Sequence, residues 1–297
     1  MPISSSQSAP LVVVVGSTGI QGGSVIKALA ESDRAYRLRG LTRDVTKPAA
    51  RKLVDQGVEM MNIDLSVENA EAVRREAFAG ANIVFMVTNF RDHLDKRREV
   101  DEGKMMVQAA MAAGVELLVW SPLESVINIS KGKYAHVDHF DGKAEVTDYA
   151  RQSGIPLVII PAGWYAINHV RSNAYIPKKQ VDGSYVLGLP GIECPAFGPG
   201  TEVLASGEDI SVREMAVQLG QITGKKVIYK QISDEEFMAA TKATPRIALE
   251  DLEMMKFYEE FGYFNGKDTT PSRKHLARAP RSWADFVKAT DWSSILA

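Results

Sequence analysis

The sequence contains little of what would mark a secreted, membrane-bound or nucleic-acid-binding protein. Its 297 residues include a single cysteine, Cys194, which excludes an intramolecular disulfide and is typical of a reducing compartment. No hydrophobic run is long enough to cross a bilayer, and residues 1–9, with neither a basic segment nor an apolar stretch, are expected to form a flexible tail. The net charge of -2 leaves no basic surface for direct contact with nucleic acid. We expect a cytoplasmic protein, with a nuclear fraction left open.

The most informative segment joins an apolar strand to three spaced glycines and then to a helix. It reads Leu11-Val-Val-Val-Val-Gly-Ser-Thr-Gly-Ile-Gln-Gly-Gly-Ser-Val25. Gly16 permits a tight turn off the strand, Gly19 lets a pyrophosphate approach the backbone, and Gly22 lets the helix pack against the sheet. The helix N-terminus directs free N–H groups and about half a positive charge toward the phosphates. The segment predicts a dinucleotide site that includes Gly16, Thr18, Gly19, Ile20, Gln21 and Gly22.

After this turn, short apolar runs alternate with helical patterns. Strands are expected at 36–42, 58–63, 82–87, 116–120 and 156–160, and helices at 48–56, 68–78, 97–113 and 138–152, with Gly57, Gly80, Gly114 and Gly154 after the helix ends. This alternation requires parallel strands with right-handed crossovers. The predicted fold is therefore α/β, a Rossmann-like doubly wound sheet with strand order 3-2-1-4-5-6. The charged stretch 91–104 is interpreted as a solvent-exposed helix face.

Beyond residue 161 the alternation stops. Glycines and prolines crowd residues 183–200 and predict a loop-rich segment with one hairpin. A helix should begin at Ser211 and end at Gly224, and others should begin at Asp234 and Ser282. The chain thus divides into the tail at 1–9, a Rossmann-like dinucleotide domain at 10–161, and a smaller α+β lobe at 162–297 for a substrate or partner.

The end of the second strand selects between the nicotinamide dinucleotides. An NAD site usually places an acid there for the ribose 2′-hydroxyl, but residues 38–43, Leu-Arg-Gly-Leu-Thr-Arg, contain none. Arg43 matches a 2′-phosphate, Lys47 adds a second charge and Thr42 a hydrogen-bond donor, so NADP(H) is the predicted cofactor. The other predicted contacts are Asp64 at the adenine and Thr88, Asn89 and Phe90 beside the nicotinamide ribose. The alternatives are a merely solvated Arg43, a loop-capping Asp64 and a packing role for Phe90.

These features resemble the NmrA-like family, a branch of the atypical short-chain dehydrogenases/reductases, and are similar to its NADPH-sensing, HSCARG-type members. The resemblance covers most of residues 10–297. The sequence motifs that carry it lie at residues 16–25, 42–47, 87–90, 121–124, 139–143 and 154–156 and in the helix with Trp283. It implies an NADP(H) domain with Arg43 and Lys47 on the 2′-phosphate and Lys143 at the nicotinamide ribose. It also implies functions divided between redox sensing through a partner and reduction. One departure is expected, because a family helix is missing between Pro195 and Gly207.

The acid–base residues of a reductase are altered here. Such enzymes usually place Tyr-x-x-x-Lys on one helix face, whereas this chain has His139 and Lys143, and Pro122 follows Ser121 where a catalytic hydroxyl is common. A neighbouring ammonium disfavours the imidazolium form, which weakens histidine as a proton donor near neutral pH and favours binding without fast turnover. Lys143, His139 and Tyr134 nevertheless remain the candidate catalytic residues. Their alternatives are a solvent-exposed lysine on the helix, a histidine that packs in the core or caps the helix, and an ordinary loop tyrosine. Trp164, Tyr165 and Asn168 are expected to wall a substrate pocket unless they only pack, and no metal site is expected.

The prediction is an NADP(H)-binding redox sensor or regulator that acts through a protein partner. The alternative is an NADPH-dependent reductase of quinone, enal or phenylpropanoid-like carbonyls, and a third class is a scaffold that the cofactor only stabilises. The expected partners are accordingly a small-molecule carbonyl or a regulatory protein, without direct contact to nucleic acid or membrane. A homodimer is left open.

Overall fold

The computed structural model describes residues 3–189, 204–273, 276 and 278–297. Two compact units comprise residues 1–123 with 139–160 (unit 1) and 124–138 with 161–297 (unit 2). Cys194 and most of the segment expected to lack a family helix lie outside the described residues. Among the described helices, none combines the length and the apolar character that a bilayer crossing needs.

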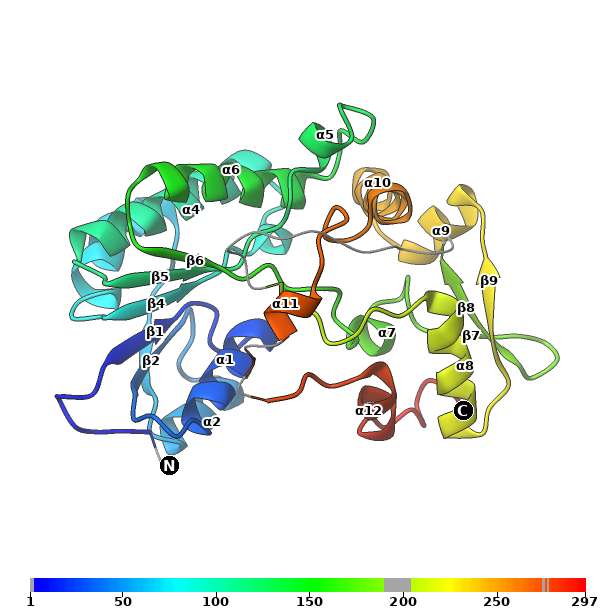
Figure 1. Ribbon diagram of the computed structural model, residues 1–297, viewed down its shortest axis with the longest axis horizontal. Helices are drawn as coiled ribbons and strands as arrows, with labels where there is room; N and C mark the ends of the chain where they lie inside the picture. Colours follow the sequence, from blue (N-terminus) through cyan, green and yellow to red (C-terminus); the bar gives the residue numbers. More distant parts are fainter. Residues whose placement is uncertain (1–2, 190–203, 274–275, 277) are drawn as a thin grey trace. The chain divides into compact units, whose positions relative to one another are not determined.

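Unit 1 is built on a six-stranded sheet with the order β3-β2-β1-β4-β5-β6, and every neighbouring pair is parallel (Figure 1). Its strands are β1 (Leu11–Val14), β2 (Arg37–Thr42), β3 (Glu59–Asn62), β4 (Ile83–Met86), β5 (Leu117–Trp120) and β6 (Leu157–Ile159). The predicted fold class and strand order are confirmed. The order reverses between β1 and β4, which is where ligands of doubly wound sheets bind.

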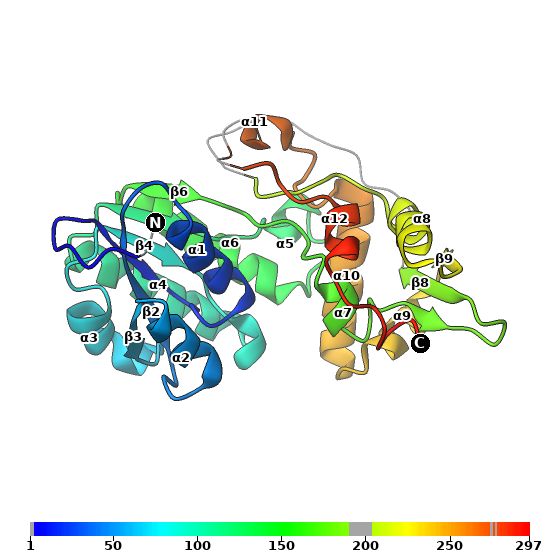
Figure 2. The ribbon, with the colours of Figure 1, turned by 90° about the horizontal axis from the view of Figure 1, so that it is seen from below.

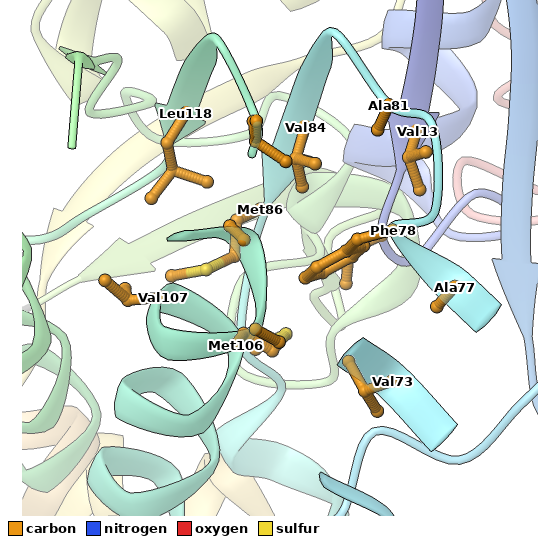
Figure 3. Close-up of a cluster of buried hydrophobic side chains, with 14 of the residues drawn as sticks. Val13, Val73, Ala77, Phe78, Ala81, Val84, Met86, Met106, Val107 and Leu118 are labelled. Carbon is orange, nitrogen blue, oxygen red and sulfur yellow. The ribbon is translucent and has the colours of Figure 1, made fainter. Parts of the chain in front are cut away.

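Helices cover both faces of this sheet. On one face lie α1 (Ile20–Ala30) and α2 (Pro48–Asp55), and on the other lie α4 (Lys96–Ala112) and α6 (Asp138–Gln152) (Figure 1). Successive side chains of β1 point to opposite faces, so Val12 and Val14 pack with Ile26 of α1, whereas Val13 joins the cluster that includes Met106 of α4 (Figure 3). The sheet is therefore buried on both sides, as the continuous apolar strands require.

The segment expected as a helix over residues 68–78 is helical over residues 67–77, but its winding is irregular. That segment forms a 3-10 turn, η1 (Val67–Asn69), a short α-helix, α3 (Ala70–Ala72), and a π-helical turn, η2 (Val73–Ala77). The guanidinium of Arg39 on β2 donates to the carbonyl oxygens of Ala77 at 3.2 Å and Ala79 at 2.9 Å. These contacts satisfy carbonyls at the helix end from outside, and the changed winding leaves Phe78 fully buried in the core (Figure 3).

Unit 2 contains a three-stranded mixed sheet and several helices (Figure 2). The strands are β7 (Lys178–Lys179), β8 (Tyr185–Leu189) and β9 (Val227–Gln231), and the helices are α5 (Val126–Ile129), α7 (Asn168–Arg171), α8 (Val212–Thr223), α9 (Asp234–Thr241), α10 (Pro245–Phe261), α11 (Thr270–Arg273) and α12 (Trp283–Lys288). The hairpin β7–β8 and the starts of α8, α9 and α12 were predicted and are confirmed, including the Ser211 cap and the left-handed Gly224. β9 and α10 were not predicted. The core of this sheet gathers Leu219, Trp283 and Trp292.

Candidate functional site

The turn between β1 and α1 has a shape that only glycine permits. Gly16 has a φ of +64°, and a Cβ atom on Gly22 would lie 2.3 Å from the carbonyl oxygen of Gly16. Among the described residues no side chain caps the N-terminus of α1 at Gly19, and Thr18 and Ile20 are exposed. The first N–H groups of α1 are therefore available to an anion, and the turn fits a pyrophosphate.

Ser17, which sequence reasoning missed, holds this turn against the neighbouring strand. Its side chain is fully buried, and its Oγ donates to the carbonyl oxygen of Leu41 at 2.9 Å. A Cβ atom on Gly40 would lie 2.8 Å from that Oγ, so glycine in the middle of β2 leaves the space for the serine. The bond positions the end of β2, which leads into Arg43. The glycine in the middle of β2 was the available signal.

Arg43, which is predicted to bind the 2′-phosphate, forms an ion pair with Asp92. Arg43 is exposed, and its Nη2 lies 2.8 Å from Oδ2 of Asp92. Asp92 ends the short 3-10 helix η3 (Phe90–Asp92) after β4, so an acid does stand here, although not on β2. Lys47 precedes α2 and is exposed, and Thr42 Oγ1 accepts from the Asp44 N–H at 3.2 Å. Asp64, after β3, and Asn89, after β4, are also exposed.

A buried charged cluster lies on the other side of the strand-order reversal. The Lys143 ammonium on α6 donates to Oε1 of Glu99 on α4, and Thr88 Oγ1, after β4, donates to the same oxygen at 2.7 Å. Glu99 is 0% exposed, Thr88 7% and Lys143 8%. The second carboxylate oxygen of Glu99 is buried and has no hydrogen-bond partner among the described residues. The interpretation of residues 91–104 as a solvent-exposed face is thus wrong at Glu99, because a lysine from another helix compensates its charge.

The helix that carries Lys143 is anchored to the sheet. Trp120, the last residue of β5, donates from its indole Nε1 to Thr147 Oγ1 at 2.8 Å, and Thr147 Oγ1 donates to the Lys143 carbonyl oxygen at 2.8 Å. The ring of His139 lies 5.8 Å from the ring of Phe90 and 4.9 Å from that of Phe140. The position of His139 is therefore set largely by aromatic packing.

Ser121 stands where reductases commonly place a catalytic hydroxyl, and it is already engaged. Its Oγ accepts a hydrogen bond from Nε2 of Gln21 on α1 at 2.5 Å. This contact joins α1 to the end of β5 across the carboxyl edge of the sheet. The Gln21 side chain, predicted as a cofactor contact, therefore lies at this edge of the sheet.

Tyr134, one of the candidate catalytic residues, belongs to unit 2. Its hydroxyl donates to Oε2 of Glu260 at 2.8 Å, and Lys133 forms an ion pair with the same carboxylate. Burial, followed by the hydrogen bond to Glu260, raises the pKa of Tyr134. A raised pKa makes this hydroxyl a poorer proton donor near neutral pH.

The predicted substrate-pocket residues also belong to unit 2. Trp164 packs edge-to-face against Tyr175, with ring centroids 4.7 Å apart, and against Tyr258 at 6.2 Å. Tyr165 is half-buried, and burial raises its pKa, whereas Asn168 begins α7. Among the described residues, no three His, Cys, Asp or Glu side chains gather as a metal ion would require.

The sheet order and the glycine turn define a Rossmann-like α/β protein. The profile of the NmrA-like family matches residues 8–196, and the chain belongs to that family. It is 34% identical over 178 residues to the NmrA-like family domain-containing oxidoreductase ptmS of Penicillium ochrochloron, a match that covers 58% of this chain and 52% of ptmS. The chain thus spans about half the length of ptmS. It is also 26% identical to an NmrA-like family domain-containing protein of Dictyostelium discoideum, over 95% of this chain and 98% of that protein.

Two solved structures share the fold. The negative transcriptional regulator NmrA, crystallised with NADP, has a TM-score of 0.76 at 20% identity over 95% of each chain, and the same regulator has been crystallised with NAD. The NADPH-dependent quinone oxidoreductase QOR2 of Escherichia coli, crystallised with NADPH, has a TM-score of 0.72 at 20% identity, over 93% of this chain and 98% of its own. A regulator and a reductase therefore share this architecture.

Proposed function

We propose that the carboxyl edge of the unit 1 sheet binds NADP(H). The observation that carries the proposal is the uncapped N-terminus of α1 beside the glycine turn, close in the sheet to the β2 end that leads to Arg43. The turn would hold the pyrophosphate, while Arg43 and Lys47 would bind the 2′-phosphate. Thr88, Asn89 and Lys143 would lie along the nicotinamide ribose, and Asp64 would lie at the adenine. The NADP and NADPH complexes of the similar structures support this assignment.

The function that we propose for the bound nucleotide is redox sensing or regulation through a protein partner. Two candidate proton donors of a reductase already donate within the chain, Lys143 to Glu99 and Tyr134 to Glu260, while His139 packs against aromatic rings. A proton donor that is held in this way transfers its proton less readily than a free one. The regulator among the similar structures agrees with this proposal. Tight binding with slow chemistry is what a sensor requires.

Calorimetry with NADPH, NADH and NADP⁺ tests both the cofactor assignment and the proposed sensor function. We expect NADPH to bind about tenfold or more tightly than NADH, and Arg43→Ala to remove most of that difference, because each tenfold preference corresponds to about 1.4 kcal/mol of phosphate contact. Arg34→Ala, which removes an exposed arginine from the opposite edge of the sheet, is the matched control. Equal affinities for NADPH and NADH would refute the cofactor assignment. Equal affinities for NADPH and NADP⁺ would refute the sensor, since a ligand pair without differential affinity shifts no equilibrium.

A reductase is the second candidate, and the relatives named as oxidoreductases favour it. When bound, NADPH would supply a hydride, and Lys143 would hold the ribose while His139 supplied a proton to the new alkoxide. The test follows NADPH absorbance with a panel of quinones, enals and phenylpropanoid-like carbonyls, and Lys143→Ala should abolish any decline. An inert panel together with tight NADPH binding would reject the enzyme.

A further inference from the structure

The Glu99–Lys143 pair lies on the side of the sheet where the nicotinamide half of a dinucleotide is expected. In a doubly wound sheet the two halves of the ligand lie on either side of the strand-order reversal, here between β1 and β4. The glycine turn and Arg43 belong to the β1–β2 side. Thr88 follows β4, and Lys143 lies on the helix between β5 and β6. The following inference rests on the proposed binding of NADP(H).

The carboxylate of Glu99 is only half satisfied by the chain. One oxygen receives both Lys143 and Thr88, whereas the other is buried without a hydrogen-bond partner among the described residues. A Cβ atom on Gly142 would lie 2.9 Å from that second oxygen, so α6 packs directly against it and leaves room only for glycine. A buried carboxylate oxygen without a partner is destabilising in the free protein, and it leaves the charge of Glu99 only partly compensated by direct hydrogen bonds.

The two redox forms of the cofactor differ by one charge at the ring. The oxidised nicotinamide ring is a cation and the reduced ring is neutral, whereas the rest of the molecule is the same. A buried carboxylate stabilises the cationic ring and a buried ammonium opposes it, and such charges act more strongly in a dry site than in water. Glu99 and Lys143 have opposite signs and touch, so their influences on the ring largely balance.

We propose that this buried pair sets the preference of the site between NADPH and NADP⁺, with Glu99 as a specificity-determining residue. Removal of the Glu99 charge leaves the ammonium and shifts the preference toward NADPH. Removal of the Lys143 charge leaves the carboxylate and shifts the preference toward NADP⁺. In the wild type the two charges oppose each other, and the balance between them sets the ratio of the two affinities.

The test measures the ratio of the dissociation constants for NADP⁺ and NADPH in five proteins. They are the wild type, Glu99→Gln, Lys143→Met, the double variant, and Asp101→Asn, which removes from the same helix an acid whose side chain is 39% exposed and pairs with Arg97. We expect the ratio to rise about tenfold in Glu99→Gln, to fall about tenfold in Lys143→Met, and to return near the wild-type value in the double variant. Asp101→Asn should leave the ratio unchanged, because solvent screens exposed charges.

The outcomes separate this inference from the function on which it rests. A ratio that stays constant while both affinities weaken together would mean that Glu99 and Lys143 only position each other, and it would overturn the inference while NADP(H) binding stands. Shifts in the same direction for both single variants would also overturn it. A wild type that binds neither nucleotide would overturn both. If a single variant does not fold, the other single variant still tests the sign of the shift, and the double variant buries neither charge.

Discussion

The replacement Gly22→Ala tests the contact that brings α1 against the end of β1. An added Cβ would lie 2.3 Å and 2.7 Å from the carbonyl oxygen and carbon of Gly16 and 2.9 Å from the carbonyl oxygen of Val15. These partners are backbone atoms that cannot rotate away, so the helix would have to move by about 1 Å to reach an ordinary contact distance. Overpacking of this kind costs up to about 3 kcal/mol, and alanine returns about 1 kcal/mol of helix propensity, which leaves a loss of about 2 kcal/mol.

Gly23→Ala is the matched control, because it makes the same chemical change one residue later in the same helix. The Cβ of that variant would lie 3.4 Å from the carbonyl oxygen of Ser17, an ordinary contact. Calorimetry should show a lower melting temperature for Gly22→Ala and an equal or higher one for Gly23→Ala. NADPH affinity should fall about tenfold or more in Gly22→Ala alone, because the displaced N–H groups no longer meet the pyrophosphate. Equal stability and affinity of the two variants would refute the reasoning.

Three other measurements probe separate parts of the molecule. Asp92→Asn should tighten NADPH binding about two- to fivefold relative to NADH, because the 2′-phosphate no longer has to displace a carboxylate from the exposed Arg43. Calorimetry at low salt that shows unchanged or weaker NADPH binding would contradict this expectation. Burial lowers the pKa of His169 to about 4 from an ordinary 6.5, so the unfolded chain takes up the proton first. The buried, neutral His169 therefore contributes about 3 kcal/mol to the free energy of unfolding; this contribution is complete above pH 6.5 and is lost as the pH falls toward 4. The free energy of unfolding of His169→Gln, measured with urea, should lack that part of the pH dependence. If it changes with pH between 6.5 and 4 as the wild type does, His169 is not the source. Ser17→Ala should cost about 1–3 kcal/mol because a buried carbonyl loses its donor, while Ser24→Ala, at an exposed helix position, should be nearly neutral in the same assay.

Sequence pattern predicted the scaffold of unit 1 because the relevant signals are local. The glycine spacing at residues 16–22 and the alternation of apolar runs with helical patterns define each βα unit from a few neighbouring residues. Chain handedness then restricts how successive units can join. The helix expected at 68–78 is present, but its 3-10 and π-helical winding was not predicted, and the partner of its terminal carbonyls, Arg39, is distant in sequence. In unit 2, the starts of α8, α9 and α12 were recognisable from their capping serines, whereas β9 and α10 were not recognised, although Pro245 and Gly262 mark the two ends of α10.

The charged partners of the site were decided by tertiary structure alone. Arg43 could be read from the end of the second strand, but Asp92, which pairs with it, arrives on a different loop 49 positions later. Likewise the family string contains Lys143, while its partner Glu99 lies within a stretch of alternating charges and has nothing in its neighbourhood to distinguish it from the exposed residues beside it. Backbone conformation follows from short-range sterics and hydrogen bonding, whereas the burial and pairing of a charge depend on which helices meet above the sheet, and no short stretch of sequence contains that information.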